Sequence, residues 1–436
     1  MDLSTGQLVL ATILKILFIL LVVVGAFAPI LIWAERRQSA MMQDRLGPTR
    51  ANLRLFGKDI RLAGLLHPLA DAVKFIFKED FVPPKADRFL HSMAPIIALV
   101  PAVGAFAVIP FADTMFWDHL GDVLPRTGPV SGPQIAMQVA PIDIGILFLF
   151  AITSTGVIGA AVAGYASDNK FSLLGGVRAA SQMVSYEVAL GLTIVPCFMI
   201  YGSLRLEDMG AWQASHQTWG IFSLPMTLAF ILFFTASIAE SKRIPFDLPE
   251  GESELVGGYL TEYSGMKFGM FFMSEFVEVV GLAALATVLF FGAWDVPFLF
   301  RDGFDLPGSW GFTIPGTAIL IGDRLPVVHW GVLLIQVIAF LIKIIVLIWL
   351  QLMIRWTLPR FRYDQVMMLC WKGLLPLALL NILFTGVVVL APGALAAMKF
   401  LGIVVLIACG YALSRVDRPL PLPTPASDLE GAKVPT

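Results

Sequence analysis

Carboxylate side chains gather in one polar stretch, residues 240–262, which reads ESKRIPFDLPEGESELVGGYLTE. Its 23 residues hold the cations Lys242 and Arg243 and six acids, Glu240, Asp247, Glu250, Glu252, Glu254 and Glu262. Acids contribute little to membrane topology and repel one another. Pro245 and Pro249 interrupt any helix through the stretch. We expect a folded acidic loop that takes part in proton chemistry, and the alternative is a solvated connector.

Ionisable residues also lie inside the apolar segments around this loop. Glu240 closes the segment before the loop, and Glu275 and Glu278 share one helical face of the segment after it. Glu187 and Lys343 lie inside two further apolar segments. Each such group costs about 2.5–3.5 kcal/mol to insert at the centre of a membrane helix. We expect these groups either to pair between helices or, as the interpretation that we favour, to carry protons from the acidic loop toward Lys343.

A second charged stretch directly follows the first apolar segment. Residues 35–50 read ERRQSAMMQDRLGPTR and hold six charged residues, of which Glu35 and Asp44 are acids. Basic residues are enriched at the cytoplasmic ends of membrane helices, which explains the arginines. It does not explain the interleaved acids.

The composition is that of a membrane protein. Hydrophobic residues make up 57% of the 436 positions and charged residues only 14%, against about 25% charged residues in soluble domains. Mean hydropathy is +0.81. A net charge of −2 argues against a nucleic-acid partner. Because backbone polar groups in lipid must be satisfied within the chain, we predict an all-α polytopic membrane protein.

Nine apolar segments approach the roughly 20 residues that a membrane-spanning helix needs. They cover residues 8–33, 91–110, 141–165, 181–203, 221–240, 268–292, 329–356, 366–391 and 395–414. We therefore expect a single membrane domain, residues 1–414, with about nine transmembrane helices. Residues 415–436 form a polar, proline-rich tail.

The distribution of basic residues predicts the orientation. The connections at 34–90, 166–180, 241–267 and 355–365, together with the tail, hold 22 of the 30 Lys and Arg residues. The connections on the opposite side hold four. Basic residues accumulate on the cytoplasmic side. We expect a periplasmic N-terminus, a cytoplasmic C-terminus and a cytoplasmic acidic loop, 241–267.

The first long connection contains a further helical pattern at residues 61–79. Apolar residues recur there at helical spacing, from Leu62 to Phe77, and His67, Asp71 and Lys74 share the other face. The segment is too short and too charged to span a membrane. We predict an amphipathic helix in the plane of the membrane interface that starts or kinks at Pro68.

Cofactor motifs are missing from the sequence. The three cysteines, Cys197, Cys370 and Cys409, lie far apart, and no CxxC, GxGxxG or Walker pattern occurs. We expect this chain itself to bind no flavin, iron–sulfur cluster or metal.

Five stretches between residues 35 and 381 carry a family likeness. They are ERRQSAMMQDRLGPTR, GLLHPLADAVKFIFKE, SLLGGVRAASQMVSYE, AESKRIPFDLPEGESELVGGYLTEYSGMKFGMFFMSEF and LIWLQLMIRWTLPRFRYDQVMMLCWKGLLPLALLN. In these stretches and their order the chain resembles the H subunit of bacterial NADH–quinone oxidoreductase (respiratory complex I), the family of mitochondrial NADH dehydrogenase subunit 1.

The resemblance implies a membrane subunit of a proton-pumping oxidoreductase that forms much of the chamber for its quinone substrate. The chamber residues that it implies are Arg36, Arg45, Arg243, Asp247, Glu250, Glu252, Glu254, Arg355 and Arg360. The proton path that it implies runs through Glu187, Glu240, Glu275 and Lys343.

The implied surroundings follow from the same likeness. The partners would be the peripheral-arm subunits of the quinone site, the other membrane-arm subunits and membrane lipid, in a bacterial inner membrane. The quinone tail would enter beside the first helix and the interfacial helix. The iron–sulfur cluster that reduces quinone would belong to a neighbouring subunit.

Three positions depart from the family pattern. Lys242 stands where the family usually has Asn, and Phe276 replaces the usual Tyr. Glu278 is an additional acid whose role the resemblance does not define.

Two other functions stay open at this point. One is the related membrane subunit of an energy-converting hydrogenase, in which the quinone site would be absent or altered. The other is a stand-alone secondary transporter. The sequence lacks the pair of Gly- or Pro-broken segments in corresponding halves that many transporters have, which argues against the transporter.

Overall fold

The structure is a computed structural model that describes residues 4–55, 58–60, 63–119, 132–249, 251, 256–301, 303–305, 312–313, 320–321, 324–391, 401–402 and 404. The loop acids Glu250, Glu252 and Glu254 lie outside the described residues. So do the tail and all but three positions of the expected segment 395–414.

Helices form most of the described chain. They are α1 (Thr5–Phe18), a π-helical stretch (Ile19–Phe27), α2 (Ala28–Met42), α3 (His67–Phe77), α4 (Arg88–Gly104), α5 (Gly145–Ala166), α6 (Lys170–Thr193), α7 (Val195–Tyr201), α8 (Leu206–Ser215), α9 (Leu224–Glu240), α11 (Gly265–Phe290), α12 (His329–Thr357), α13 (Tyr363–Met368), a second π-helical stretch (Leu369–Leu374) and α14 (Leu375–Leu390). Within the described ranges, seven helical runs are long and apolar enough to cross a membrane, and α9 is apolar but shorter. These eight overlap the first eight expected segments.

Short antiparallel strands occupy some of the connections. The pairs are β1 (Leu53–Leu55) with β2 (Lys58–Ile60), β3 (Met115–Phe116) with β4 (Gln134–Ile135), and β7 (Phe312–Thr313) with β8 (Leu320–Ile321). A three-stranded sheet has the order β5 (Leu299–Phe300), β6 (Gly303–Asp305), β9 (Arg324–Pro326), with Phe304 opposite Leu299 and Leu325. The expectation of a helical fold holds for the first eight apolar segments, and the strands of the described residues lie in the connections between helices.

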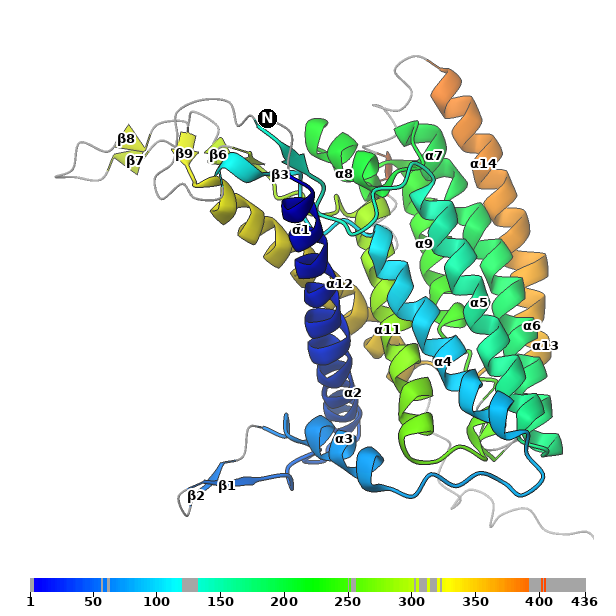
Figure 1. Cartoon of the computed structure of the whole chain (residues 1–436). Helices are drawn as coiled ribbons and strands as arrows, with labels where there is room; N and C mark the ends of the chain where they lie inside the picture. Colours follow the sequence, from blue (N-terminus) through cyan, green and yellow to red (C-terminus); the bar gives the residue numbers. More distant parts are fainter. Residues whose placement is uncertain are drawn as a thin grey trace, which may run out of the picture.

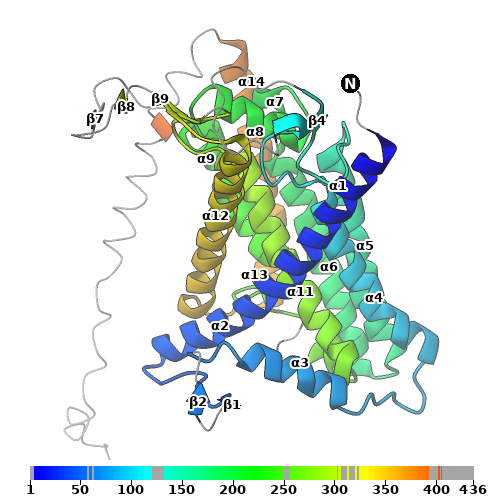
Figure 2. The same cartoon turned by 60° about the vertical axis from the view of Figure 1, so that its left-hand side comes forward.

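The long helices form a bundle with two members set apart. Helices α4, α5, α6, α9, α11 and α14 run side by side, whereas α12 leans away from the bundle at its upper end (Figure 1). Figure 2 shows the first helix, Thr5–Met42, as one long rod that passes in front of α11. Helix α3 lies across the lower end of the molecule, at a steep angle to the long helices (Figures 1 and 2).

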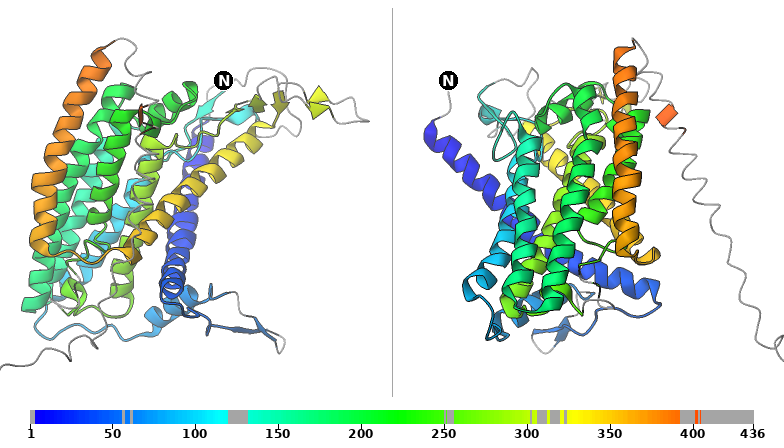
Figure 3. Two further views of the ribbon diagram at one scale, coloured as in Figure 1. Left: turned by 180° about the vertical axis from the view of Figure 1, so that it is seen from behind. Right: turned by 90° about the vertical axis from the view of Figure 1, so that its right-hand side faces the viewer.

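Helix α11 is the core of the bundle, and Figure 3 shows it behind and between its neighbours. Seventeen of its 26 residues are buried, because it packs against α2, α4, α9 and α12 at once. A helix that is apolar on all sides is typical of such a central position. Its two acids, Glu275 and Glu278, are therefore carried into the interior of the protein.

The polar connections that were expected on one side of the membrane do meet at one end of the molecule. Arg36 pairs with Asp71 of α3 at 2.6 Å, and Arg360 pairs with Asp247 of the acidic loop at 3.0 Å. The side chain of Asn169 donates to Glu262 at 2.7 Å. Each of these contacts directly joins one predicted cytoplasmic connection either to another one or to α3.

The interfacial helix is shorter than the sequence predicted. It begins at His67, so the expected start at Pro68 is confirmed to within one residue. Pro68 lies in the first turn, where the missing N–H costs no hydrogen bond. Leu69, Ile76 and Phe77 are exposed. These exposed apolar side chains are what a helix resting in a membrane interface would present to lipid.

Close approach between helices depends on small residues. A Cβ added at Gly164 of α5 would lie 2.7 Å from the backbone oxygen of Ser172 and 3.0 Å from the Cα of Gly176 in α6. Gly156, about two turns earlier on α5, has no atom within 4 Å of the corresponding position. Small residues at such crossings let backbones pack closely in membrane bundles.

We predict that Gly164→Ala lowers the free energy of unfolding by about 1–3 kcal/mol, because the added methyl group must push two helix backbones apart. Gly156→Ala on the same helix is the matched control and is expected to be neutral or slightly stabilising. Thermal denaturation of the full chain in detergent, followed by circular dichroism, measures both variants. Equal midpoints for the two variants would contradict the packing argument.

Candidate functional site

A single carboxylate joins three segments at the lower end of the bundle. Glu35 near the end of α2 accepts a hydrogen bond from Arg243 of the acidic loop at 3.1 Å and forms an ion pair with Arg355 of α12 at 2.6 Å. The three side chains are only 12–19% exposed. Buried charges of this kind persist only when they are paired, so the triad fixes α2, the loop and α12 relative to one another.

Apolar groups surround the two arginines of this triad. The guanidinium of Arg243 lies over the ring of Phe276, with 4.2 Å between its central carbon and the ring centroid. Both arginines and Phe276 also line a small pocket between α2, α9, α11 and α12. The phenyl ring of Phe276 therefore offers the aromatic face that attracts a cation.

The acidic loop is anchored beside the triad through Asp247. Its carboxylate accepts a hydrogen bond from Arg360 at 3.0 Å, and the backbone N–H of Phe361 donates to the carbonyl of Pro245 at 3.0 Å. Burial raises the pKa of Asp247 to about 6, although the Arg360 guanidinium favours its charged form. Nearby Glu275 contributes to this rise, and Arg355 and Arg243 act against it. Asp247 therefore changes charge near pH 6.

A larger pocket has Glu35 in its lining and lies between the end of α2, the start of α3 and Trp356 of α12. Its volume is about 410 Å³, within the range of small-molecule sites. Its lining consists of Glu35, Arg36, Ser39, Arg45, Gly47, Pro48, Thr49, Arg50, His67 and Trp356. Guanidinium groups donate several hydrogen bonds and accept none. The pocket is thus suited to a ligand that carries carbonyl or other acceptor oxygens.

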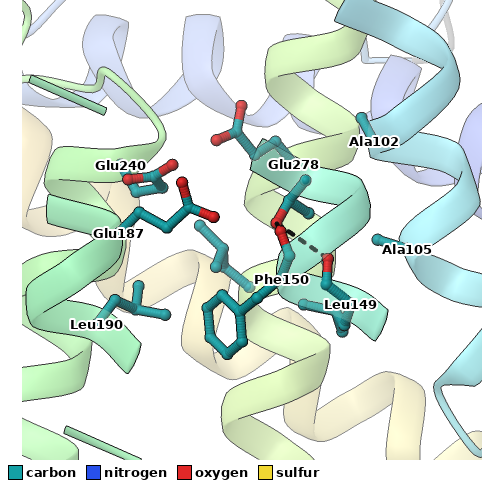
Figure 4. Close-up of a pocket in the computed structure, with 11 residues that line it drawn as sticks. Ala102, Ala105, Leu149, Phe150, Glu187, Leu190, Glu240 and Glu278 are labelled. Atoms are coloured by element: carbon teal, nitrogen blue, oxygen red, sulfur yellow. Dashed lines mark hydrogen bonds between the residues drawn. The ribbon is translucent and has the colours of Figure 1, made fainter. Parts of the chain in front are cut away.

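Three carboxyl groups face a second, enclosed space deeper in the bundle. Figure 4 shows Glu187 of α6 and Glu240 of α9 next to each other, with Glu278 of α11 across the cavity from them. The rest of the lining is mostly apolar and comes from α4, α5, α6 and α11. About 30 Å³ of the cavity is open to the centres of water molecules, which is room for about two waters. Ser154 of α5 donates a hydrogen bond to Glu187.

Glu275 and Lys343 lie outside this cavity. Glu275 accepts a hydrogen bond from the hydroxyl of Tyr259 at 3.0 Å. Lys343 donates to the backbone carbonyls of Phe291, Ala293 and Asp295 at 2.6–3.0 Å. A cation at this place neutralises the partial negative charge of a helix C-terminus. The structure thus brings Glu187 and Glu240 together, but it does not bring Lys343 to them.

Comparison with known proteins gives the chain a family. The family model described as NADH dehydrogenase matches residues 14–386. An H subunit of the NADH-quinone oxidoreductase of Koribacter versatilis is 39% identical over 392 residues, which cover 88% of this chain and 99% of the relative. An H subunit of the same enzyme of Geobacter metallireducens is 42% identical over 382 residues, 87% of this chain and 96% of the relative. The chain belongs to the family of NADH-quinone oxidoreductase H subunits.

Several residues that organise the site in this member of the H-subunit family were not among the predicted site residues. Glu35 carried a signal, because it is an acid among arginines where membrane topology accounts only for the arginines. Asp71, which binds Arg36, was placed only on the polar face of the interfacial helix. Tyr259 and Ser154 carried no signal, since hydroxyl residues are common in loops and membrane helices.

Metal binding has no support among the described residues of the chain. In those ranges no group of three or more His, Cys, Asp or Glu side chains could hold a metal ion. Cys197 and Cys370 are buried and form no disulfide.

We predict that Glu35→Ala lowers the free energy of unfolding by about 3–5 kcal/mol, because it leaves two buried guanidinium charges without their shared carboxylate. The matched control is Asp364→Ala. Asp364 pairs with Arg362 at 3.9 Å, and both side chains are at least 74% exposed to solvent. Such exposed pairs contribute about 0–1 kcal/mol to the free energy of unfolding. Denaturation midpoints of the full chain in detergent measure both, and a Glu35 variant as stable as the control would count against the triad.

Proposed function

We propose that this chain is the membrane subunit of a proton-pumping NADH–quinone oxidoreductase, in which it forms much of the quinone chamber and couples quinone reduction to proton translocation. The observation that carries the proposal is the triad of Glu35, Arg243 and Arg355. Glu35 lines the basic pocket, which suits a ligand with acceptor oxygens, and it also pairs with Arg243 of the acidic loop. The triad thus connects the pocket with the loop and, through the loop, with the buried carboxylates. Membership of the H-subunit family supports the same function.

The basic pocket fits a quinone head group. A quinone has two carbonyl oxygens that accept hydrogen bonds, and Arg36 and Arg45 supply donors. Trp356 in the same lining offers an aromatic surface for a planar ring. Leu69 and Phe77 of α3 are exposed next to this end of the molecule. We infer that the apolar tail of the quinone leaves the pocket between α2 and α3 and reaches the lipid there.

Charge changes on the quinone provide the coupling. Reduction adds two electrons and two protons, and any delay between them leaves negative charge in the chamber. Arg243, Arg355 and Arg360 would be drawn toward that charge, which weakens their hold on Glu35 and Asp247. Asp247, with its pKa near 6, then takes up a proton more readily. In this proposal the change passes from Asp247 to Glu275 and on to the buried acids Glu240 and Glu187.

The proposed setting follows from the same arrangement. The end that carries α3 and the acidic loop would face the cytoplasm and the peripheral-arm subunits, and the N-terminus would be periplasmic, in the inner membrane of a bacterium. Those neighbouring subunits would hold the flavin and iron–sulfur clusters that deliver electrons. The remaining loop acids, Glu250, Glu252 and Glu254, are proposed to lie below the quinone head group.

We predict that Asp247→Asn lowers inhibitor-sensitive NADH–quinone reductase activity of the assembled complex about tenfold at pH 7.5, which corresponds to about 1.4 kcal/mol in the activation barrier. At pH 5.5 the deficit should shrink to about threefold, because most of the wild-type carboxyl is then itself neutral. Activity with both proteins is measured across this pH range in membranes.

Two controls accompany this experiment. Ferricyanide reduction by NADH bypasses the quinone site and should stay at the wild-type level in the variant. Asp364→Asn removes an exposed cytoplasmic carboxylate and should leave the pH profile unchanged. A pH-independent deficit, or no deficit at pH 7.5, would contradict the role of Asp247. Assembly with hydrogenase-type carriers instead of a quinone-reducing arm would favour the alternative complex.

A further inference from the structure

Glu278, not Glu275, is the α11 acid that faces the enclosed cavity. The two acids are three residues apart, so their side chains leave α11 within about 60° of each other but about 4.5 Å apart along the axis. Glu275 is engaged by Tyr259 at the level of the acidic loop. Glu278 lies one turn deeper and lines the cavity together with Glu187 and Glu240.

The cavity has an unsatisfied acceptor that needs a hydrogen donor. Glu240 is only 8% exposed, and its Oε2 atom has no hydrogen-bond partner in the part of the chain that the structure describes. Buried polar atoms are nearly always hydrogen-bonded. Two donors could serve it in this space, namely a water molecule or a protonated carboxyl group of a neighbour, and Figure 4 shows Glu187 and Glu278 as those neighbours. Because the cavity has room for about two waters, water and a neighbouring carboxyl group can lie beside Glu240 at the same time.

Charged groups from every side act on Glu278. Glu275 lies on its own helix, Glu187 comes from α6 and Glu240 from α9, and the cations Lys242 and Arg243 come from the loop that follows α9. Three carboxyl groups at one cavity form a coupled set, in which the charge of each depends on the protons held by the others. Glu278 interacts with Glu275 and with both loop cations, and Glu240 also interacts with Lys242.

We propose that Glu278 is the link that carries protons between Glu275 and the pair Glu187 and Glu240 through water held in the cavity. This inference rests on the proposed function and adds a residue to its path. In the step that we propose, the Glu275 carboxyl loses its proton and the Glu278 carboxylate gains it. The proton then passes through water to the Glu240 carboxylate. One O–H bond breaks and one forms at each stage, and the total charge of the four acids does not change.

The test is Glu278→Gln, compared with Glu278→Asp, in the whole complex reconstituted into sealed vesicles. The readouts are NADH–quinone reductase activity and the number of protons translocated per NADH oxidised. We expect the Gln variant to lower the number of protons per NADH, or the coupled rate, about tenfold, because an amide cannot carry a proton between carboxylates. The Asp variant retains a carboxyl group and should recover most of the loss, which a purely structural role of Glu278 would not explain.

Two controls and one further test variant make the result interpretable. Ferricyanide reduction reports that the complex has assembled. Asp143→Asn makes the same carboxylate-to-amide change at a side chain that is 92% exposed and should leave pumping unchanged. Gly281→Ala adds a methyl group to the cavity lining, where its Cβ would meet the Phe106 ring at 3.5 and 3.6 Å and no other atom of the described residues within 4 Å. That methyl takes up space comparable to a water and should reduce pumping while every carboxyl group stays in place.

Glu187→Gln separates this inference from the function on which it rests. Normal pumping by Glu278→Gln, together with loss in Glu187→Gln, would overturn the role of Glu278 and leave the proposed coupling intact. Normal pumping by both variants would overturn the coupling itself. If Glu278→Gln does not assemble, normal pumping by Gly281→Ala would overturn the water-mediated link instead.

Discussion

The cost of burying charge governs how this membrane protein is put together at its functional end. Glu35 and Arg243 are 208 residues apart in the chain, yet they share one nearly dry site with Arg355. None of the three can remain there alone, because an unpaired buried charge costs several kcal/mol. The position of the acidic loop, and with it the distance from the basic pocket to Asp247 and Glu275, therefore follows from where α2 and α12 place their charged ends. A ligand that attracts either arginine therefore affects all three segments that the triad holds together.

Helix α11 transmits this constraint into the bundle. It begins beside the acidic loop, is buried for most of its length and carries acids on two successive turns. The loop end and the interior cavity are thus two levels of one rigid helix. The first level is bonded to Tyr259 and the second opens onto Glu187 and Glu240. The two acids therefore have different surroundings, although they lie only about one helical turn apart.

The helices could be predicted from the sequence because bilayer thickness sets a minimum length for apolar segments, and the unusual acids could be recognised because lipid makes them costly. The residues that surround these acids in the folded protein could not be predicted. Periodicity places Glu275 and Glu278 on one face but cannot tell which of the two meets α6 and α9. The same limit applies to Lys343, which was expected on the path of the acids and is found on the carbonyls after α11. Glu35 shows it again, since both of its partners come from distant segments of the chain and only their packing brings them together.

The π-helical stretch Ile19–Phe27 has a consequence for residues far from it. In this stretch the first helix is wound more loosely, as in the N–H of Ala28, which bonds to the carbonyl of Val23, five residues earlier. A wider turn rotates everything that follows about the helix axis, relative to an uninterrupted α-helix. The direction around the helix axis in which Glu35 and Arg36 leave α2 is therefore set by uncharged residues about two turns or more earlier in the same helix. The uncharged residues of this stretch thus determine the direction in which the charged side chains leave the helix.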